Sequence, residues 1–131
     1  MTPWGASSPS GQAGEARASA FLAARGYRLR AQNWHCRYGE WDLIFAAPDD
    51  TLWVFVEVRF RRRPLGGQTA ATITPAKQRR LTQAAQLYLA HCATAEHRNP
   101  PPCRFDVIAL TGPTPDDARL HWIRNAFSAV N

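Results

Sequence analysis

A hairpin pattern in the first half of the sequence constrains the fold of this chain more than any other feature. Two apolar runs, residues 39–47 and 51–60, flank a Pro-Asp-Asp turn at 48–50, and this pattern predicts two neighbouring antiparallel strands. Successive side chains of a strand point to opposite faces. The valine-rich face of the second run is predicted to be core. The opposite face mixes apolar and charged side chains, namely Trp53, Phe55, Glu57, Arg59 and Arg61.

The predicted hairpin brings Asp42 of the first run close to Glu57 of the second. Two neighbouring carboxylates repel each other and destabilise a fold unless a cation lies between them. Mg²⁺ (or Mn²⁺) is held by one or two carboxylates, with waters and substrate phosphate as further ligands. Asp42 and Glu57 are therefore predicted metal ligands, with Arg59 as an adjacent positive charge, a combination typical of phosphodiester hydrolysis. The alternative is an exposed sheet face on which the two carboxylates form surface salt bridges with Arg37, Arg59 or Arg61.

The rest of the chain alternates between helix and strand signals. A Thr-Pro pair at 74–75 is typical of a helix start, and Gly26 is well placed to end the first helix. The resulting order, αβββαβ with an optional further strand, predicts an α/β domain with a mixed sheet flanked by helices. The expected elements outside the hairpin are a helix at 14–25 with Glu15 in its first turn, a strand at 27–34, a long helix at 74–96, strands at 103–110 and 119–124, and a helical turn at 125–130.

Length and composition predict one domain inside the cell. The chain has 131 residues, enough for a single domain over 14–131, and the Ser-, Gly- and Pro-rich residues 1–13 are predicted to be a flexible arm. No apolar run approaches the ~20 residues of a bilayer span, and the first residues lack the pattern of a secretory signal. Three cysteines without a Cys-x-x-Cys pair indicate reduced thiols and no zinc site. We therefore expect a cytoplasmic protein that does not contact membranes.

The charge of the chain points to a polyanionic partner. Sixteen basic residues against ten acidic ones give a net charge of +6, and nucleic acid is the first candidate. Consecutive arginines, Arg61, Arg62 and Arg63, lead into a Gly-containing loop at 64–67, and they are the best candidates for contacts to the DNA backbone, together with Arg80. A solvated turn is the alternative for this cluster. The tryptophans Trp34, Trp41 and Trp53 are predicted to be core or interface residues rather than base-stacking platforms.

The motifs reached so far resemble a known group of nucleases. Asp42, the triplet Glu57-Val58-Arg59 and Glu15 upstream resemble the PD-(D/E)xK signature. More closely, the segments "GEWDLI", "VFVEVRFR", "TPAKQRRL" and "RFDVIA" resemble, in this order, the YraN-type family of restriction-endonuclease-like proteins, over residues 14–127. The resemblance implies a restriction-endonuclease-like fold akin to Holliday junction resolvases, which act on DNA as homodimers. It also implies Asp42 and Glu57 as metal ligands and Glu15 as a supporting carboxylate.

One position departs from the nuclease signature, because Arg59 stands where the signature has lysine. An arginine stays protonated, so it can stabilise phosphate charge but cannot act as a general base. Lys77, the only lysine of the chain, lies in the first turn of the predicted long helix and is a candidate substitute. The alternative for Lys77 is a solvated lysine on a basic face with Arg79 and Arg80.

Two further carboxylates and three functional readings stay open at this point. Asp106 is expected to have a structural role, such as orienting Arg104 or Arg59, rather than to be a further site carboxylate. Glu40 either extends the acidic pair or forms a salt bridge with Arg37. The first reading is a metal-dependent DNA endonuclease, with branched DNA among its candidate substrates. The second is a nucleic-acid-binding protein of nuclease fold without turnover, for which Arg59 is the main argument, and the third is a partner-binding protein.

Overall fold

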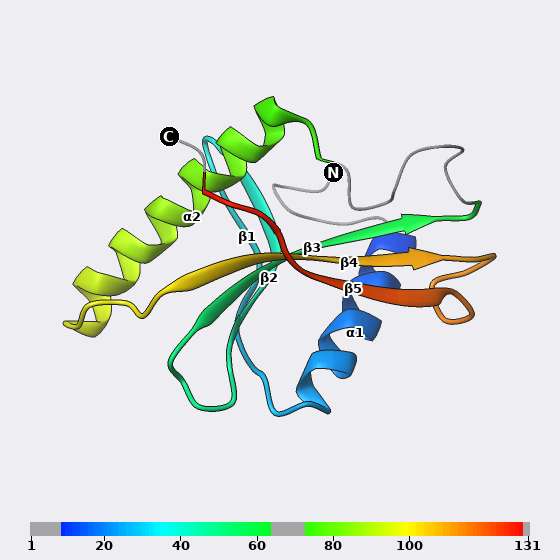
Figure 1. Ribbon diagram of the computed structural model, residues 1–131, viewed down its shortest axis with the longest axis horizontal. Coiled ribbons are helices and arrows are strands. Elements are labelled where there is room, and N and C mark those ends of the chain that lie inside the picture. Colours follow the sequence, from blue (N-terminus) through cyan, green and yellow to red (C-terminus); the bar gives the residue numbers. More distant parts are fainter. Residues whose placement is uncertain (1–8, 64–72, 130–131) are drawn as a thin grey trace.

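The computed structural model describes residues 9–63 and 73–129, and they form a five-stranded sheet with two helices (Figure 1). The predicted order of elements is confirmed, and the optional last strand is present. The expected loop at 64–67 and the first eight residues of the expected arm lie outside the described residues. The elements are α1 (Pro9–Ala23), β1 (Arg28–Cys36), β2 (Gly39–Ala46), β3 (Trp53–Arg61), α2 (Pro75–Glu96), β4 (Cys103–Thr111) and β5 (Arg119–Phe127).

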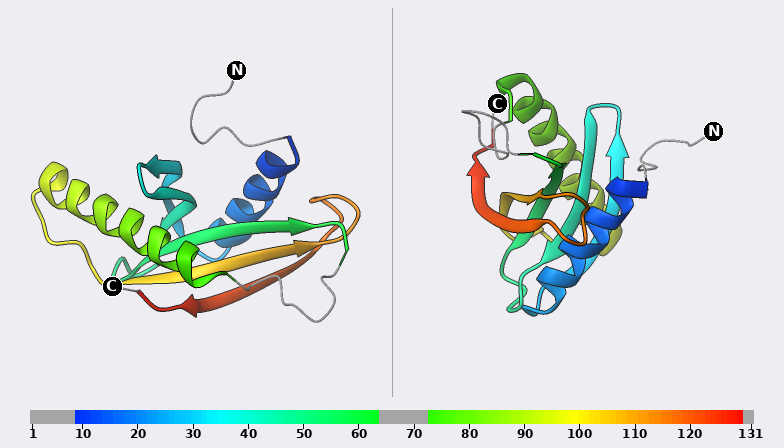
Figure 2. Two further views of the ribbon diagram at one scale, coloured as in Figure 1. Left: turned by 90° about the horizontal axis from the view of Figure 1, so that it is seen from above. Right: turned by 90° about the vertical axis from the view of Figure 1, so that its right-hand side faces the viewer.

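The sheet is mixed, and its strands follow the order of the sequence, β1-β2-β3-β4-β5. Among the described strands, β3 and β4 pair in parallel, with α2 as the crossover between them, and the other three pairs are antiparallel. The helices α1 and α2 lie on the two sides of the strands (Figure 1), and the sheet between them is strongly twisted (Figure 2).

Both faces of the central strand β3 are core. Val54 and Val56 pack beneath α1 with Leu22, whereas Trp53 and Phe55 pack beneath α2 with an aromatic cluster. The sequence predicted the valine face as core and Trp53 as a core or interface residue, but a sheet with a helix on each side also buries Phe55 and Glu57. The predicted alternative of an exposed sheet face is therefore wrong at Glu57, of which 7% is exposed.

The long helix α2 starts and packs as its sequence predicts. The hydroxyl of Thr74 accepts the backbone N–H of Lys77 at 3.2 Å and caps the first turn. The buried stripe of α2 includes the predicted residues Leu81, Ala85, Tyr88 and Cys92. This start fixes Lys77 in the first turn, on the side of the sheet that carries Phe55.

Two boundaries differ from the prediction. Helix α1 begins at Pro9, so residues 9–13 are helical and not part of an arm. Strand β5 continues to Phe127, so the predicted helical turn at 125–130 is wrong for its first three residues. The reason is a bulge in β5, where Asn125 has a φ of 53° and donates its backbone N–H to Asp106 at 2.9 Å. Among the described residues, no helix is long and apolar enough to cross a bilayer.

Candidate active site

The site forms where β2 separates from β3. The two strands are paired from Leu43↔Val56 to Ala46↔Trp53. Just beyond the end of this ladder, the Asp42 side chain takes the place of a backbone acceptor, since its Oδ2 accepts the Val58 N–H at 2.7 Å. The carboxylate is thereby inserted between the strands at the point where they part.

Four carboxyl groups from three elements converge at this point. Glu15 of α1 and Glu40 and Asp42 of β2 each place an oxygen within 4.8 Å of the others. Glu57 of β3 lies near enough to Asp42 for its charge to raise the pKa of the Asp42 carboxyl group. The structure thus places Glu40 in the acidic cluster, whereas Arg37 donates to the Tyr38 hydroxyl at 3.0 Å. We call Glu15, Glu40, Asp42 and Glu57 the carboxylate cluster.

The carboxylate cluster holds more negative charge than its surroundings stabilise. Burial and, after it, the charges of Glu57 and Glu15 together raise the pKa of Asp42 to about 9, although the hydrogen bond from Val58 acts in the opposite direction. Burial and the neighbouring Glu15 also raise the pKa of Glu40.

The donor set of the cluster fits a hard divalent cation. All of its potential ligand atoms are carboxylate oxygens, which suit Mg²⁺ or Mn²⁺ and not zinc in a structural site. The sequence predicted Asp42 and Glu57 as ligands. In the structure Glu15, Glu40 and Asp42 each place an oxygen within 4.8 Å of the others, and Glu57 lies beside Asp42. Glu15 is therefore better placed as a ligand than as a supporting carboxylate.

Lys77 reaches the cluster from the α2 side. Its Nζ lies 2.7 Å from Glu57 Oε2, and the lysine side chain is 42% exposed whereas that of Glu57 is 9% exposed. This contact lines a cavity of about 240 Å³. Among the residues around this cavity are Tyr38, Glu40, Asp42, Glu57, Lys77 and Arg80.

The predicted arginines divide into two groups. Arg80 is exposed at the rim of the cavity, next to Lys77. Arg59 is half-buried on β3, two residues past Glu57, and the described residues that line the cavity do not include it. The consecutive arginines begin four residues past Glu57, roughly 13 Å along the strand at ~3.3 Å per residue. The structure therefore does not bring Arg61, Arg62 and Arg63 into the cavity.

Asp106 lies apart from the cavity and has the structural role that its sequence context favoured. It is fully buried and accepts two hydrogen bonds from Arg104, at 2.8 and 2.9 Å. The indole of Trp122 and the backbone N–H of Asn125 donate to it as well, each at 2.9 Å. The predicted core positions of Trp41 and Trp53 are confirmed, because both are fully buried.

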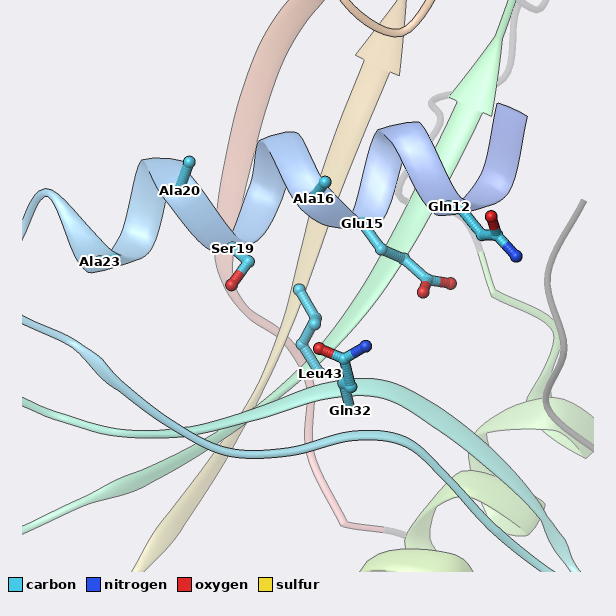
Figure 3. Close-up of a pocket in the computed structure, with 8 residues that line it drawn as sticks. All are labelled: Gln12, Glu15, Ala16, Ser19, Ala20, Ala23, Gln32 and Leu43. Atoms are coloured by element: carbon cyan, nitrogen blue, oxygen red, sulfur yellow. The ribbon is translucent and has the colours of Figure 1, made fainter. Parts of the chain in front are cut away.

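A second cavity, of about 420 Å³, adjoins the cluster on the α1 side, and the sequence did not reveal it. Its walls are α1 and the strands β1 and β2, and Gln12, Glu15 and Ser19 of the helix point toward it (Figure 3). Their spacing of three and four residues on one helix face was the available signal. We call this cavity the α1 groove.

Comparison with known proteins identifies close relatives. A family model described as "Uncharacterised protein family UPF0102" matches residues 14–110. A UPF0102 protein of Cupriavidus taiwanensis is 50% identical over 119 residues, which cover 91% of this chain and 82% of the relative. UPF0102 proteins of Symbiobacterium thermophilum and Stutzerimonas stutzeri are 48% identical over 120 residues and 45% identical over 124 residues. These matches cover 91% and 94% of this chain and 96% and 98% of the two relatives.

Proposed function

The chain belongs to the UPF0102 family, and from its site geometry we propose that it is a metal-dependent DNA endonuclease with a restriction-endonuclease-like, Holliday junction resolvase-like fold. The observation that carries this proposal is the convergence of the carboxylate cluster with Lys77. Three oxygens lie within 4.8 Å of one another, and an ammonium lies 2.7 Å from the fourth carboxylate. Phosphodiester hydrolysis needs both a place for a cation and a donor to phosphate oxygen.

The residues of the cavity have separate roles in this proposal. Glu15, Glu40 and Asp42 would hold Mg²⁺ or Mn²⁺, with Glu57 beside them. The ion would supply a polarised phosphate and an activated water. Lys77 donates hydrogen bonds, and it sits between Glu57 and the solvent, so it can contact a non-bridging oxygen of the scissile phosphate. Arg80 at the rim would hold a neighbouring phosphate.

A second candidate, a nucleic-acid-binding protein without turnover, is favoured by one observation only. Arg59 occupies the position at which the nuclease signature has lysine, and arginine cannot exchange a proton. The contact of Lys77 with Glu57 favours the enzyme, because it places a lysine at the carboxylates from a different element. DNA as the partner and a homodimer as the assembly belong to the proposal in either case.

The test is cleavage of labelled DNA in the presence of Mg²⁺ or Mn²⁺. The substrates are a four-way junction, a flap, a single strand and a linear duplex of the same sequence. We expect divalent-dependent cleavage of at least one of them. Since outer-shell partners of a metal already contribute about 10–100-fold, Asp42→Asn, Glu15→Gln and Glu57→Gln should each lower the rate by at least about 100-fold.

The matched control is Asp50→Asn, which changes an exposed aspartate at the hairpin turn, where φ is 61° and asparagine is tolerated. It should cleave like the wild type. A protein that binds all four substrates in a salt-dependent way but cleaves none of them, with the cluster variants binding equally well or better, would be the binding module instead.

A further inference from the structure

The α1 groove differs in character from the cavity at Lys77, although the two meet at the carboxylate cluster. Glu15 lines the groove and is also one of the three clustered ligand residues. Asp42 and Glu40 line the cavity on the α2 side. The cluster therefore lies at the junction of two openings, one beneath each helix.

The two openings carry different charges. The α2-side cavity has two cationic side chains, Lys77 and Arg80. The α1 groove, among the described residues, has Glu15 as its single charged side chain, and its other lining side chains are alanines, a serine, two glutamines and a leucine. In a chain with sixteen basic residues, a lining without basic side chains among the described residues is a distinctive feature. A phosphate finds cations in the cavity and only a carboxylate in the groove.

The α1 groove offers hydrogen bonds and apolar contacts. The amides of Gln12 and Gln32 and the hydroxyl of Ser19 each can donate and accept. In Figure 3 the Gln32 amide lies below Ser19 and Glu15 and beside Leu43, so polar groups from the helix and the strand face the same space. A volume of about 420 Å³ is within the range of pockets that hold small organic groups.

We propose that the α1 groove binds one unpaired nucleobase of the substrate strand, next to the phosphate that lies at the carboxylate cluster. This inference rests on the proposed function and deepens it, because it names the substrate class. A heterocyclic base is neutral, carries donors and acceptors on its edge, and has apolar faces that suit alanine and leucine contacts. Glutamine is among the side chains that pair with base edges.

The geometry has a consequence for the substrate. A base that lies between a helix and a sheet cannot stay paired with a complementary strand, and the enzyme must either meet it unpaired or open the pair at a free-energy cost. The cut strand is therefore DNA with an unpaired nucleotide beside the scissile phosphate. A mismatch, a flap junction and a single strand all satisfy this condition.

The test uses one DNA sequence in three forms, with the nucleotide beside the cut paired, unpaired or replaced by an abasic residue. We expect the wild type to cleave the unpaired form at least about tenfold faster than either the paired or the abasic form, as one base contact provides. Equal rates on the unpaired and abasic forms would overturn the inference, because the base would then contribute nothing.

Variants of the groove assign the preference to its lining. Gln32→Ala removes an exposed amide and should lower the ratio of unpaired to abasic cleavage toward one. Gln86→Ala, an exposed glutamine on α2, is the matched control and should keep the ratio. Ser19→Leu narrows the groove and should also lower the ratio of unpaired to abasic cleavage. With two groove variants, the test stays valid if one of them fails to fold. An unchanged ratio in both groove variants would count against the proposal.

A binding measurement separates this inference from the proposed function. The probe is the same DNA with 2-aminopurine at the unpaired position, titrated with protein in Ca²⁺, which shares the oxygen preference of Mg²⁺. We expect a fluorescence change that Gln32→Ala and Ser19→Leu diminish and Gln86→Ala does not. If this pattern appears without cleavage of any DNA, the groove binds a base and the nuclease proposal fails. If cleavage occurs without this pattern, the groove inference fails and the nuclease proposal stands.

Discussion

Two aspartates inside the sheet, Asp42 on β2 and Asp106 on β4, show how similar placements produce different properties. Each carboxylate accepts a backbone N–H of the neighbouring strand where the ladder is interrupted, from Val58 at 2.7 Å and from Asn125 at 2.9 Å. Asp106 also receives two hydrogen bonds from Arg104 and one from Trp122. Asp42 has other carboxyl groups around it instead.

The difference lies in where the balancing charge comes from. At Asp106 the guanidinium of Arg104, two residues away on the same strand, supplies it, so the unit is complete within the fold. At Asp42 the neighbouring charges of Glu57 and Glu15 are also negative, and together with burial they raise its pKa to about 9. A balanced carboxylate indicates a structural role, whereas an unbalanced group of carboxylates fits the cation site that we propose.

Asp106→Ala should give the largest change in stability. It leaves the Arg104 guanidinium, the Trp122 indole and the Asn125 N–H without their acceptor in the interior, and breaking a buried pair in this way costs about 3–5 kcal/mol. Urea denaturation measures this loss as a lower free energy of unfolding. Asp50→Asn is the control and should change the free energy of unfolding by less than about 0.5 kcal/mol. A loss below about 1 kcal/mol for Asp106→Ala would show that the Asp106 unit is not balanced as described.

Lys77→Met tests the cation that serves the carboxylate cluster. Arg104 is held by Asp106, whereas Lys77 is 42% exposed and can turn from Glu57 to a substrate phosphate. We expect the cleavage rate to fall by about 10²–10³-fold, as for the loss of one donor to a developing charge. DNA affinity should change little, since one phosphate contact among several is lost.

The control for Lys77→Met is Arg79→Met, an exposed neighbour on the same helix. It should keep the cleavage rate and weaken DNA binding at most slightly. Equal losses of rate in both variants would mean that Lys77 acts only as part of a basic surface. An unchanged cleavage rate and DNA affinity in Lys77→Met would support the alternative from the sequence, that Lys77 is a solvated surface lysine.

Asp42→Asn should stabilise the metal-free protein, with a sign opposite to that of Asp106→Ala. The pKa of Asp42 is about 9 in the folded state and about 3.9 in an unfolded chain. The contribution of a group with a raised pKa is present below the unfolded value and is lost as the pH rises toward the folded value. Asparagine cannot ionise and still accepts the Val58 N–H, so the variant escapes this loss.

The expected gain in the free energy of unfolding is about 1–2 kcal/mol at pH 8 in EDTA, and it should shrink at pH 5. Urea denaturation of both proteins at the two pH values measures it. Mg²⁺ should then raise the stability of the wild type and leave the variant unchanged, because only the wild type binds the ion well. A variant that is less stable than the wild type by the same amount at both pH values contradicts the argument.

The parts of the molecule that local patterns determine were predictable. The hairpin alternation and its short turn placed Asp42 beside Glu57, and the Thr74–Pro75 start placed Lys77 in the first turn of α2. The structure has both. Such features depend on strand periodicity and on capping, which a single segment of sequence encodes.

The parts that depend on packing between distant segments were not predictable. Glu15 joins Glu40 and Asp42 only because α1 lies across the sheet, and the residues of α1 by themselves do not indicate that approach. The second core face of β3 follows from the same packing. Strand β5 extends to Phe127 because Asp106, on the neighbouring strand, accepts the N–H of Asn125 at the bulge. The sequence of β5 alone does not indicate this acceptor.

Arg28→Ala isolates burial as the variable, and it should have the smallest effect. Arg28 and Asp50 form an arginine–aspartate pair at 2.9 Å, a distance similar to that between Arg104 and Asp106, but their side chains are 63% and 42% exposed. Water and salt screen such a pair, so its loss should lower the free energy of unfolding by at most about 0.5 kcal/mol, and less at high salt. Arg104→Ala is the counterpart, and it should cost several times more because it leaves Asp106 charged in the interior. If urea denaturation gave the two variants equal losses, distance rather than burial would determine the strength of these pairs, and the contrast between Asp42 and Asp106 would lose its physical basis.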